Sequence, residues 1–235
     1  LNPKKTRVLL YTGYHDHAIF YSVVSPPIGL YRLKNYLERR DMHCDVHDLG
    51  LTQGNFGDTL EKISKGYLVG WFQDRMEFTH RALGNRSILA DPRRPDVLHH
   101  INKLVKMRDF WMPFAPSILE ERQDDYIINP KKIDARYMAI GFDSTPLAMK
   151  HLSAGLHPFD KTMRPQVVTA KDNPGYHSLI KEFEKITGVG ALLNTSFNIH
   201  GEPIVGSPSD AIDTLERCGL KHLYIGDFLV SKKIE

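Results

Sequence analysis

Five arginines fall within a short stretch of the chain that begins at Trp71. They are Arg75, Arg81, Arg86, Arg93 and Arg94. Guanidinium groups stay charged at any working pH and bind phosphate or carboxylate through two parallel hydrogen bonds. The arginines are interleaved with apolar residues and with Ala82-Leu83-Gly84, a glycine-bearing turn whose backbone N–H groups can face an anion. The pattern predicts a local anion site, although a solvated charged face has a similar composition.

A second basic pair, Lys106 and Arg108, stands at the end of a helical pattern that begins near Pro95. Residues two apart diverge on a helix but point to the same side of an extended segment. We therefore expect both side chains to lie just beyond the helix, on a strand or at its start. The alternative is that the two charges only stabilise the negative end of the helix dipole.

The third chemical element is the polar end of an apolar strand, in the segment 191–205. Asn194, Thr195, Ser196 and Asn198 follow the apolar residues, and Gly201 comes shortly after. Short amide and hydroxyl side chains at a strand end commonly supply hydrogen bonds to a ligand in α/β folds. A turn capped by the same residue types would look similar.

Other catalytic patterns are missing from the sequence. It has no HExxH pair, no Cys/His quartet, no GxxxxGK[ST] phosphate loop and no GxSxG elbow. These absences disfavour a zinc site, a P-loop ATPase and an α/β-hydrolase, and we expect no protein-held metal.

The composition narrows the class of protein. The chain has 235 residues, is 41% hydrophobic and 25% charged, and carries a net charge of only +3, which disfavours nucleic-acid binding by bulk charge. Two cysteines, Cys44 and Cys218, cannot form a multi-bridge framework, and the first thirty residues do not resemble a signal peptide, so we expect a cytoplasmic protein. The longest apolar runs are too short to span a membrane.

The order of predicted elements indicates an α/β fold with a mixed, twisted sheet and packed helices. Residues 7–12, 27–40 and 43–48 predict a short βαβ unit, so we place an appendage at 1–50, a linker at 51–57 and the main domain at 58–235. Expected strands of the main domain are 67–72, 115–119, 136–142, 165–169, 190–194, 222–225 and 228–231, and expected helices are 59–64, 95–105, 174–187 and 207–217. Strands do not alternate one for one with helices, which favours a mixed sheet.

Three segments resemble the C-terminal domain of the carbamoyltransferases that modify antibiotics and nodulation factors. They are GWFQDRMEFTHRALGNRSILADPR, INKLVKMRDFWMPFAPSIL and NPGYHSLIKEFEKITGVGALLNTSFNIHGEPIVGSPSDAI. The resemblance covers about Asp58 to Lys232 and implies a fold similar to YrdC-type domains, which form carbamoyladenylate from ATP and carbamoyl phosphate. The sequence departs from the family pattern in two segments. Asp74 replaces a glycine and Thr79-His80 replaces Gly-Pro, while in the segment 157–166 Lys161 replaces a glycine and one residue is inserted.

The resemblance also implies roles for individual residues. Lys-x-Arg and Ser-x-Asn form the signature of such domains, so the catalytic set would be Lys106, Arg108, Ser196 and Asn198. Contacts to the substrates are expected from Arg75, Arg81, Arg86, Asn194, Thr195, Arg164 and Gln166. Mg²⁺ would accompany the phosphates of ATP.

Members of this family normally carry a long N-terminal domain that binds iron and passes the carbamoyl group to an acceptor hydroxyl. Residues 1–50 instead resemble the start of a cobalamin-binding domain of radical enzymes, without its cobalamin loop, so we expect no cofactor there. A separate partner protein would then supply the transfer domain. Two alternatives remain open from the sequence: an RNA-binding YrdC-like module and an inactive interaction domain.

Overall fold

The computed structural model describes residues 56–102, 105, 113–226 and 228–232, together with the backbone of three strands nearer the N-terminus. Those strands are β1 (Thr6–Leu10), β2 (Ile19–Val23) and β3 (Met42–Asp45). The other elements, in chain order, are α2 (Gly57–Ser64), β4 (Val69–Phe72), β5 (Arg86–Ala90), α3 (Asp96–Ile101), β6 (Ala115–Leu119), η2 (Glu120–Arg122), α4 (Gln123–Tyr126), β7 (Ile127–Ile128), β8 (Asp143–Ser144), α5 (Pro146–His151), η3 (Ser153–Gly155), β9 (Gln166–Val168), α6 (Pro174–Thr187), β10 (Ala191–Ser196), α7 (Pro208–Arg217), β11 (His222–Ile225) and β12 (Phe228–Lys232).

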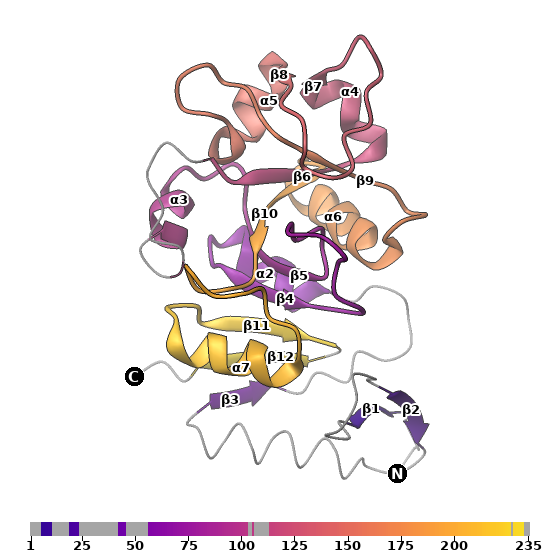
Figure 1. Ribbon diagram of the computed structural model, residues 1–235, viewed down its shortest axis with the longest axis vertical. Helices are drawn as coiled ribbons and strands as arrows, with labels where there is room; N and C mark the ends of the chain where they lie inside the picture. Colours follow the sequence, from indigo (N-terminus) through magenta and orange to yellow (C-terminus); the bar gives the residue numbers. More distant parts are fainter. Residues whose placement is uncertain are drawn as a thin grey trace.

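An eight-stranded sheet runs through the molecule in the order β3-β12-β11-β4-β5-β10-β6-β9 (Figure 1). The pairs β4–β11 and β6–β9 are parallel, and the other neighbours are antiparallel. The predicted mixed α/β fold is therefore confirmed. None of the described helices is long and apolar enough to cross a bilayer.

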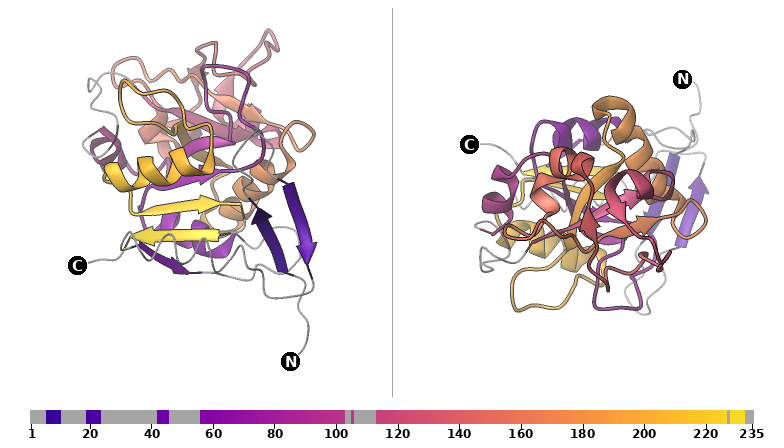
Figure 2. Two further views of the ribbon diagram at one scale, coloured as in Figure 1. Left: turned by 60° about the horizontal axis from the view of Figure 1, so that its bottom comes forward. Right: turned by 90° about the horizontal axis from the view of Figure 1, so that it is seen from above.

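Successive residues of the sheet supply two hydrophobic cores, because side chains alternate between the faces of a strand. Trp71 and Leu89 belong to the core that includes residues of α2 and α6. Their neighbours Phe72 and Ile88 belong to the core that includes residues of α3 and α7. Helices thus cover both faces of the sheet, and α7 can be seen beside β11 in Figure 2.

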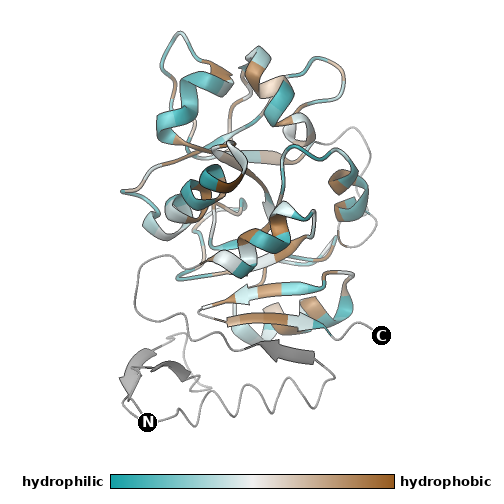
Figure 3. Cartoon of the chain, turned by 180° about the vertical axis from the view of Figure 1, so that it is seen from behind, coloured by the Kyte–Doolittle hydropathy of each residue, from teal (hydrophilic) through white to brown (hydrophobic). Residues whose placement is uncertain are grey.

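Among the described helices, the two longest begin and end where their sequences indicate. Asn173 and Ser207 are the N-caps of α6 and α7, each is followed by a proline, and α6 ends at Gly188 with a left-handed φ of 76°. The buried residues of α6 are all hydrophobic or aromatic, and Figure 3 shows hydrophilic residues on the remainder of the helix. This amphipathic pattern explains why the sequence alone predicts the helix at residues 174–187.

The sequence prediction of the main domain does not include α4, α5, β7 and β8, and it also differs from the structure at two strands. Residues 136–142 do not form the predicted strand: Met138 has a φ of 54°, and only Phe142 makes an isolated bridge, with Met163. Conversely, β5 is absent from the predicted strands. All five of its residues are buried, but two of them, an arginine and a serine, are polar and interrupt the apolar pattern that predicts a buried strand. Apolar patterning cannot reveal a strand whose polar residues are paired by the tertiary fold.

The N-terminal strands do not pair as the βαβ prediction requires. β1 pairs with β2 in an antiparallel ladder, and β3 pairs with β12 at the edge of the main sheet. Residues 24–41, which include the predicted helix, lie outside the described residues. Residues 51–55 of the predicted linker also lie outside them, and α2 begins at Gly57.

The cap of α7 gives a stability prediction. The Ser207 side chain accepts a hydrogen bond from the Asp210 backbone N–H, and the Asp210 carboxylate accepts one from Ser207 N–H in return. We expect Ser207→Ala to lower the free energy of unfolding by about 1 kcal/mol. The measurement is urea denaturation, with Ser64→Ala at the exposed end of α2 as the matched control. An equal loss in both variants would contradict the capping role.

Candidate functional site

A small polar pocket opens beside the end of β10 and has a volume of about 60 Å³. It is lined by His80, Arg81, Ala82, Pro113, Phe114, Ala115, Met138, Arg164, Asn194, Thr195 and Ser196. Five of the predicted site residues, which come from three distant parts of the sequence, therefore meet at one place. Lys106 and Arg108 lie outside the described residues, so their placement stays a prediction from the sequence.

Arg81 is the arginine of the 71–94 segment that lines this pocket. Its side chain is half-buried, and it forms no hydrogen bond or ion pair with another residue of the described part of the chain. An unpaired guanidinium in a partly enclosed polar pocket is well suited to bind an anion.

Arg86 turns inward. It is only 4% exposed, and its guanidinium donates hydrogen bonds to the backbone carbonyls of Gln73 (2.5 Å), Asp74 (2.9 Å) and Asn85 (3.0 Å). Its Cζ also lies 3.6 Å from the centroid of the Phe72 ring. Burial lowers the pKa of Arg86 to about 10, and the charges of Glu77 and Asp74 partly offset that effect. These contacts make Arg86 a residue that holds the loop, and its predicted contact with a substrate stays a prediction from the sequence.

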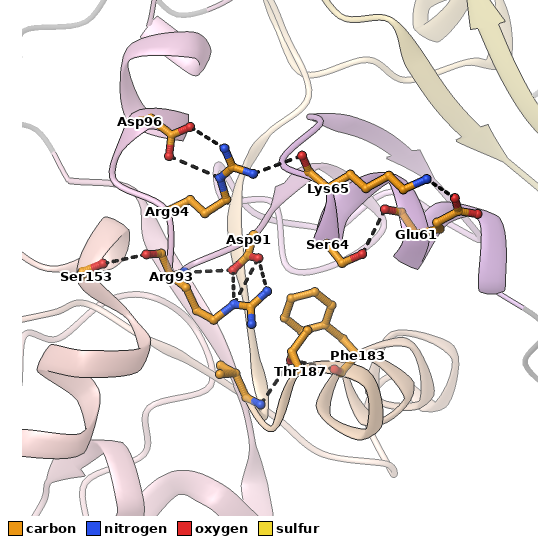
Figure 4. Close-up of polar contacts among 11 residues, drawn as sticks. Glu61, Ser64, Lys65, Asp91, Arg93, Arg94, Asp96, Ser153, Phe183 and Thr187 are labelled. Carbon is orange, nitrogen blue, oxygen red and sulfur yellow. Dashed lines mark hydrogen bonds and ion pairs between the residues drawn. The ribbon is translucent and has the colours of Figure 1, made fainter.

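The remaining arginines of the predicted cluster also lie apart from the pocket lining. Arg75 is exposed, and its backbone carbonyl accepts a hydrogen bond from the Asn85 amide. Arg93 pairs with the fully buried Asp91, and Arg94 pairs with Asp96 (Figure 4). The tertiary structure thus divides a cluster that looks continuous in the sequence.

A buried hydrogen-bond network joins the Arg81 loop to the sheet. The Asn194 amide donates to the Ala82 carbonyl (3.2 Å), to Ser117 Oγ (3.0 Å) and to Gln166 Oε1 (3.2 Å). Ser117 Oγ donates to Gln166 Oε1, and the Gln166 amide donates to the Leu83 carbonyl, both at 2.7 Å. Gln166, predicted as a substrate contact, does not line the pocket and instead positions the loop beside it.

Tyr176 of α6 packs under the same loop. Gly84 has a φ of 109°, and a Cβ on it would lie 2.2 Å from the Tyr176 ring. The Tyr176 hydroxyl is buried and has no hydrogen-bond partner among the described residues, and neither has Asn194 Oδ1. Burial raises the pKa of Tyr176, so the hydroxyl keeps its proton.

Ser196 and Asn198 have different environments. Ser196 Oγ donates to Asn198 Oδ1 at 2.7 Å, and the Asn198 amide donates to the carbonyls of Ile199 (3.1 Å) and Glu202 (2.7 Å). Asn198 therefore shapes the turn after β10, while Ser196 lines the pocket.

Glu77 holds the loop that carries Arg81, and the sequence analysis does not single it out. Its Oε1 accepts hydrogen bonds from three backbone N–H groups, those of Leu83 (2.7 Å), Asn85 (2.7 Å) and Arg86 (3.3 Å). The only sequence signal is an acidic residue among arginines, ahead of a glycine-bearing turn, and that signal does not reveal the contacts.

A larger apolar cavity of about 310 Å³ lies beside the polar pocket, and both are lined by Pro113 and Phe114. Its other lining residues are Pro95, Leu98, Asn102, Met149, Ser153, Leu156, Pro158 and Lys161. Such walls suit a flat, weakly polar ring system.

The geometry defines a mixed α/β domain with a small polar pocket at the end of a central strand. Its fold is similar to HypF of T. kodakarensis, with a TM-score of 0.50 and 18% identity over 83% of this chain and 23% of that one. The family model described as carbamoyltransferase C-terminus matches residues 60–232. The chain belongs to this family.

Two relatives illustrate the similarity. Nodulation protein NolO of Bradyrhizobium diazoefficiens is 42% identical over 171 residues, which make up 73% of this chain and 31% of NolO. The 3'-hydroxymethylcephem-O-carbamoyltransferase of Amycolatopsis lactamdurans is 30% identical over 175 residues, covering 70% of this chain and 31% of that protein. The chain spans less than two fifths of the length of the first curated relatives it matches.

Two of the three positions where the family resemblance calls for glycine, Asp74 and Lys161, have a left-handed backbone, and Thr79 does not. Asp74 has a φ of 45° and Lys161 a φ of 59°, a region in which Cβ is strained and glycine is not. The Asp74 carbonyl nevertheless accepts a hydrogen bond from Arg86, so the loop keeps this conformation without glycine.

Asp74→Gly tests the strain and the charge together. We expect the free energy of unfolding to rise by about 1 kcal/mol, because glycine adopts the positive φ without a Cβ clash. If ATP binds beside this loop, as the sequence predicts, its Kd should also fall, because the variant removes a carboxylate that would repel the phosphates. Lys132→Gly, at another exposed position with a φ of 50°, is the matched control for strain alone. An unchanged Kd for ATP would show that the Asp74 carboxylate points away from the phosphates.

Gly84→Ala should destabilise the protein strongly. The new Cβ would meet both an unfavourable φ and the Tyr176 ring. Gly188→Ala is the control, because Gly188 has a φ of 76° and a methyl group there would have no described atom within 4 Å. We expect thermal or urea unfolding to show a loss of about 1 kcal/mol for Gly188→Ala and about 1–3 kcal/mol more for Gly84→Ala. Equal losses would mean that the Tyr176 contact yields without cost.

Proposed function

We propose that this chain forms carbamoyladenylate from ATP and carbamoyl phosphate. The single observation that carries the proposal is Arg81, unpaired among the described residues, in a pocket shared with Asn194, Thr195 and Ser196, in a chain of the carbamoyltransferase C-terminus family. Hydrolysis of carbamoyl phosphate gives carbamate and phosphate. A carbamate oxygen then attacks the α-phosphorus of ATP, and the bond to pyrophosphate breaks.

In this proposal the polar pocket neutralises and orients the anions. Arg81 and Arg164 supply positive charge, and the Thr195 and Ser196 hydroxyls supply hydrogen bonds. Lys106 and Arg108 are assigned to the phosphates on the strength of the sequence alone. Adenylate formation requires alignment and charge neutralisation more than proton transfer, which fits a site of cations, hydroxyls and amides.

We place the nucleoside of ATP in the apolar cavity next to this pocket. Leu98, Phe114 and Leu156 offer apolar contacts of the kind that a purine ring prefers. Because the two hollows share Pro113 and Phe114, a nucleoside in one would put its phosphates near the other. Mg²⁺ would arrive on the phosphates and keep several of its waters.

Transfer of the carbamoyl group to an acceptor hydroxyl is proposed to take place in an iron-binding domain distinct from residues 60–232. Transfer needs the acceptor oxygen held about 3–3.5 Å from the carbamoyl carbon. An O-carbamoyltransferase among the relatives is consistent with a hydroxyl acceptor, and this chain spans 31% of that relative.

Pyrophosphate release tests the proposal. The purified chain, given ATP, Mg²⁺ and carbamoyl phosphate, should release pyrophosphate, and omission of carbamoyl phosphate should abolish the signal. Arg81→Ala and the double variant Lys106→Ala/Arg108→Ala should each lower the rate about 10–100-fold, since each loses charge-assisted hydrogen bonds. Arg94→Ala, which removes the surface pair with Asp96, is the control. Wild-type release no faster than that of the double variant would refute the proposal.

A further inference from the structure

We propose that Glu77 is a positioning residue that sets the direction of Arg81 by gathering the backbone of the loop around it. The inference rests on the proposed function and adds to it a residue that does not itself line the pocket. One carboxylate oxygen of Glu77 accepts hydrogen bonds from the N–H groups of Leu83, Asn85 and Arg86. These three residues follow closely after Arg81, so their placement dictates where the Arg81 backbone lies.

The loop has little packing of its own ahead of Arg81. Phe78 is fully exposed, and Thr79 and His80 are exposed as well. Ala82, by contrast, is only 2% exposed, and its carbonyl accepts a hydrogen bond from Asn194. The conformation of the loop is therefore determined by hydrogen bonds to the residues that follow Arg81, and Glu77 accepts three of these bonds.

Glu77 also supports the other side of the loop through Arg86. The buried Arg86 guanidinium binds the carbonyls of Gln73 and Asp74, where the loop begins. The negative charge of Glu77 counteracts part of the fall in the pKa of Arg86 that burial causes. The Glu77 carboxylate thus binds the end of the loop directly, at Leu83, Asn85 and Arg86. It also favours the charged form of the Arg86 guanidinium, which binds the start of the loop.

The Arg81 side chain needs this support because its own contacts do not hold it. It forms no hydrogen bond or ion pair within the described residues, so its aim follows from the position of its Cα. A displacement of the loop by about 1 Å is enough to misalign a catalytic contact.

The decisive experiment is a double-mutant cycle on pyrophosphate release. Glu77→Ala should raise the KM for carbamoyl phosphate about tenfold and leave the KM for ATP within about twofold. In an Arg81→Ala background the same change should alter the KM for carbamoyl phosphate by less than about twofold, because Glu77 acts through Arg81. Glu77→Gln keeps an acceptor oxygen, so its KM for carbamoyl phosphate should be close to that of the wild type. It also replaces Glu77→Ala in the cycle if that variant does not fold.

Asp210→Ala is the matched control. Asp210 likewise accepts backbone hydrogen bonds, from Gly206 and Ser207, but on α7 and outside the pocket lining. It should lower the thermal midpoint and leave both KM values unchanged. The inference is overturned if Glu77→Ala behaves in the same way, or if its effect on KM is fully retained in the Arg81→Ala background.

Phosphate binding separates this inference from the proposed function. If the wild type releases no pyrophosphate, the proposed function fails. The double-mutant cycle of Glu77→Ala and Arg81→Ala is then repeated with the Kd for inorganic phosphate as the readout. Losses for Glu77→Ala and Arg81→Ala that do not add would still support the positioning role. Additive losses, or a wild type that binds no phosphate, would overturn it. Faster hydrogen exchange at the amides of Leu83, Asn85 and Arg86 in Glu77→Ala is expected in either case.

Discussion

The site depends on one constraint, which is that the backbone polar groups of the irregular loop 73–86 must find partners as it folds against the sheet. Side chains satisfy this need from both directions. Glu77 accepts from backbone N–H groups, and Arg86, Asn194 and Gln166 donate to backbone carbonyls. A loop held by so many paired groups keeps one conformation, and that conformation places Arg81 in the lining of the pocket, together with Arg164.

The sheet topology explains where these partners come from. β10 lies between β5 and β6, and β6 carries β9 on its other side, so residues from four strands approach one loop. Asn194 on β10, Ser117 on β6 and Gln166 on β9 form the buried network beneath it. Gly84 allows Tyr176 of α6 to pack close to the same loop. The position of the loop therefore depends on the fold of the sheet, because the strands that build the core also hold the loop in place.

The arginines of the 71–94 segment differ in burial and in the groups they contact. Arg86 is buried against carbonyl oxygens and an aromatic ring, Arg93 is neutralised by the buried Asp91, and Arg94 is paired at the surface with Asp96. Each of these guanidiniums already has partners, so binding a ligand would require it to break existing contacts. Arg81 makes no comparable contact with the described residues, which is why we propose that an anion binds in the pocket it lines.

The sequence by itself determined the mixed α/β class, the extents of α6 and β6, and the basic character of the site, because periodic apolar patterns, caps and local charge are encoded in neighbouring residues. It also indicated that Asn194, Thr195 and Ser196, at the polar end of β10, belong to one site, and all three line the pocket. It did not reveal β5, the roles of Glu77 and Arg86, or the division of the arginine cluster. Those depend on partners far away in the chain: Asn194 reaches Ala82 across 112 positions, and Gln166 reaches Leu83 across 83. Only the tertiary structure decides which arginine of the 71–94 segment lines the pocket, because a charged side chain takes its role from the groups that folding brings beside it.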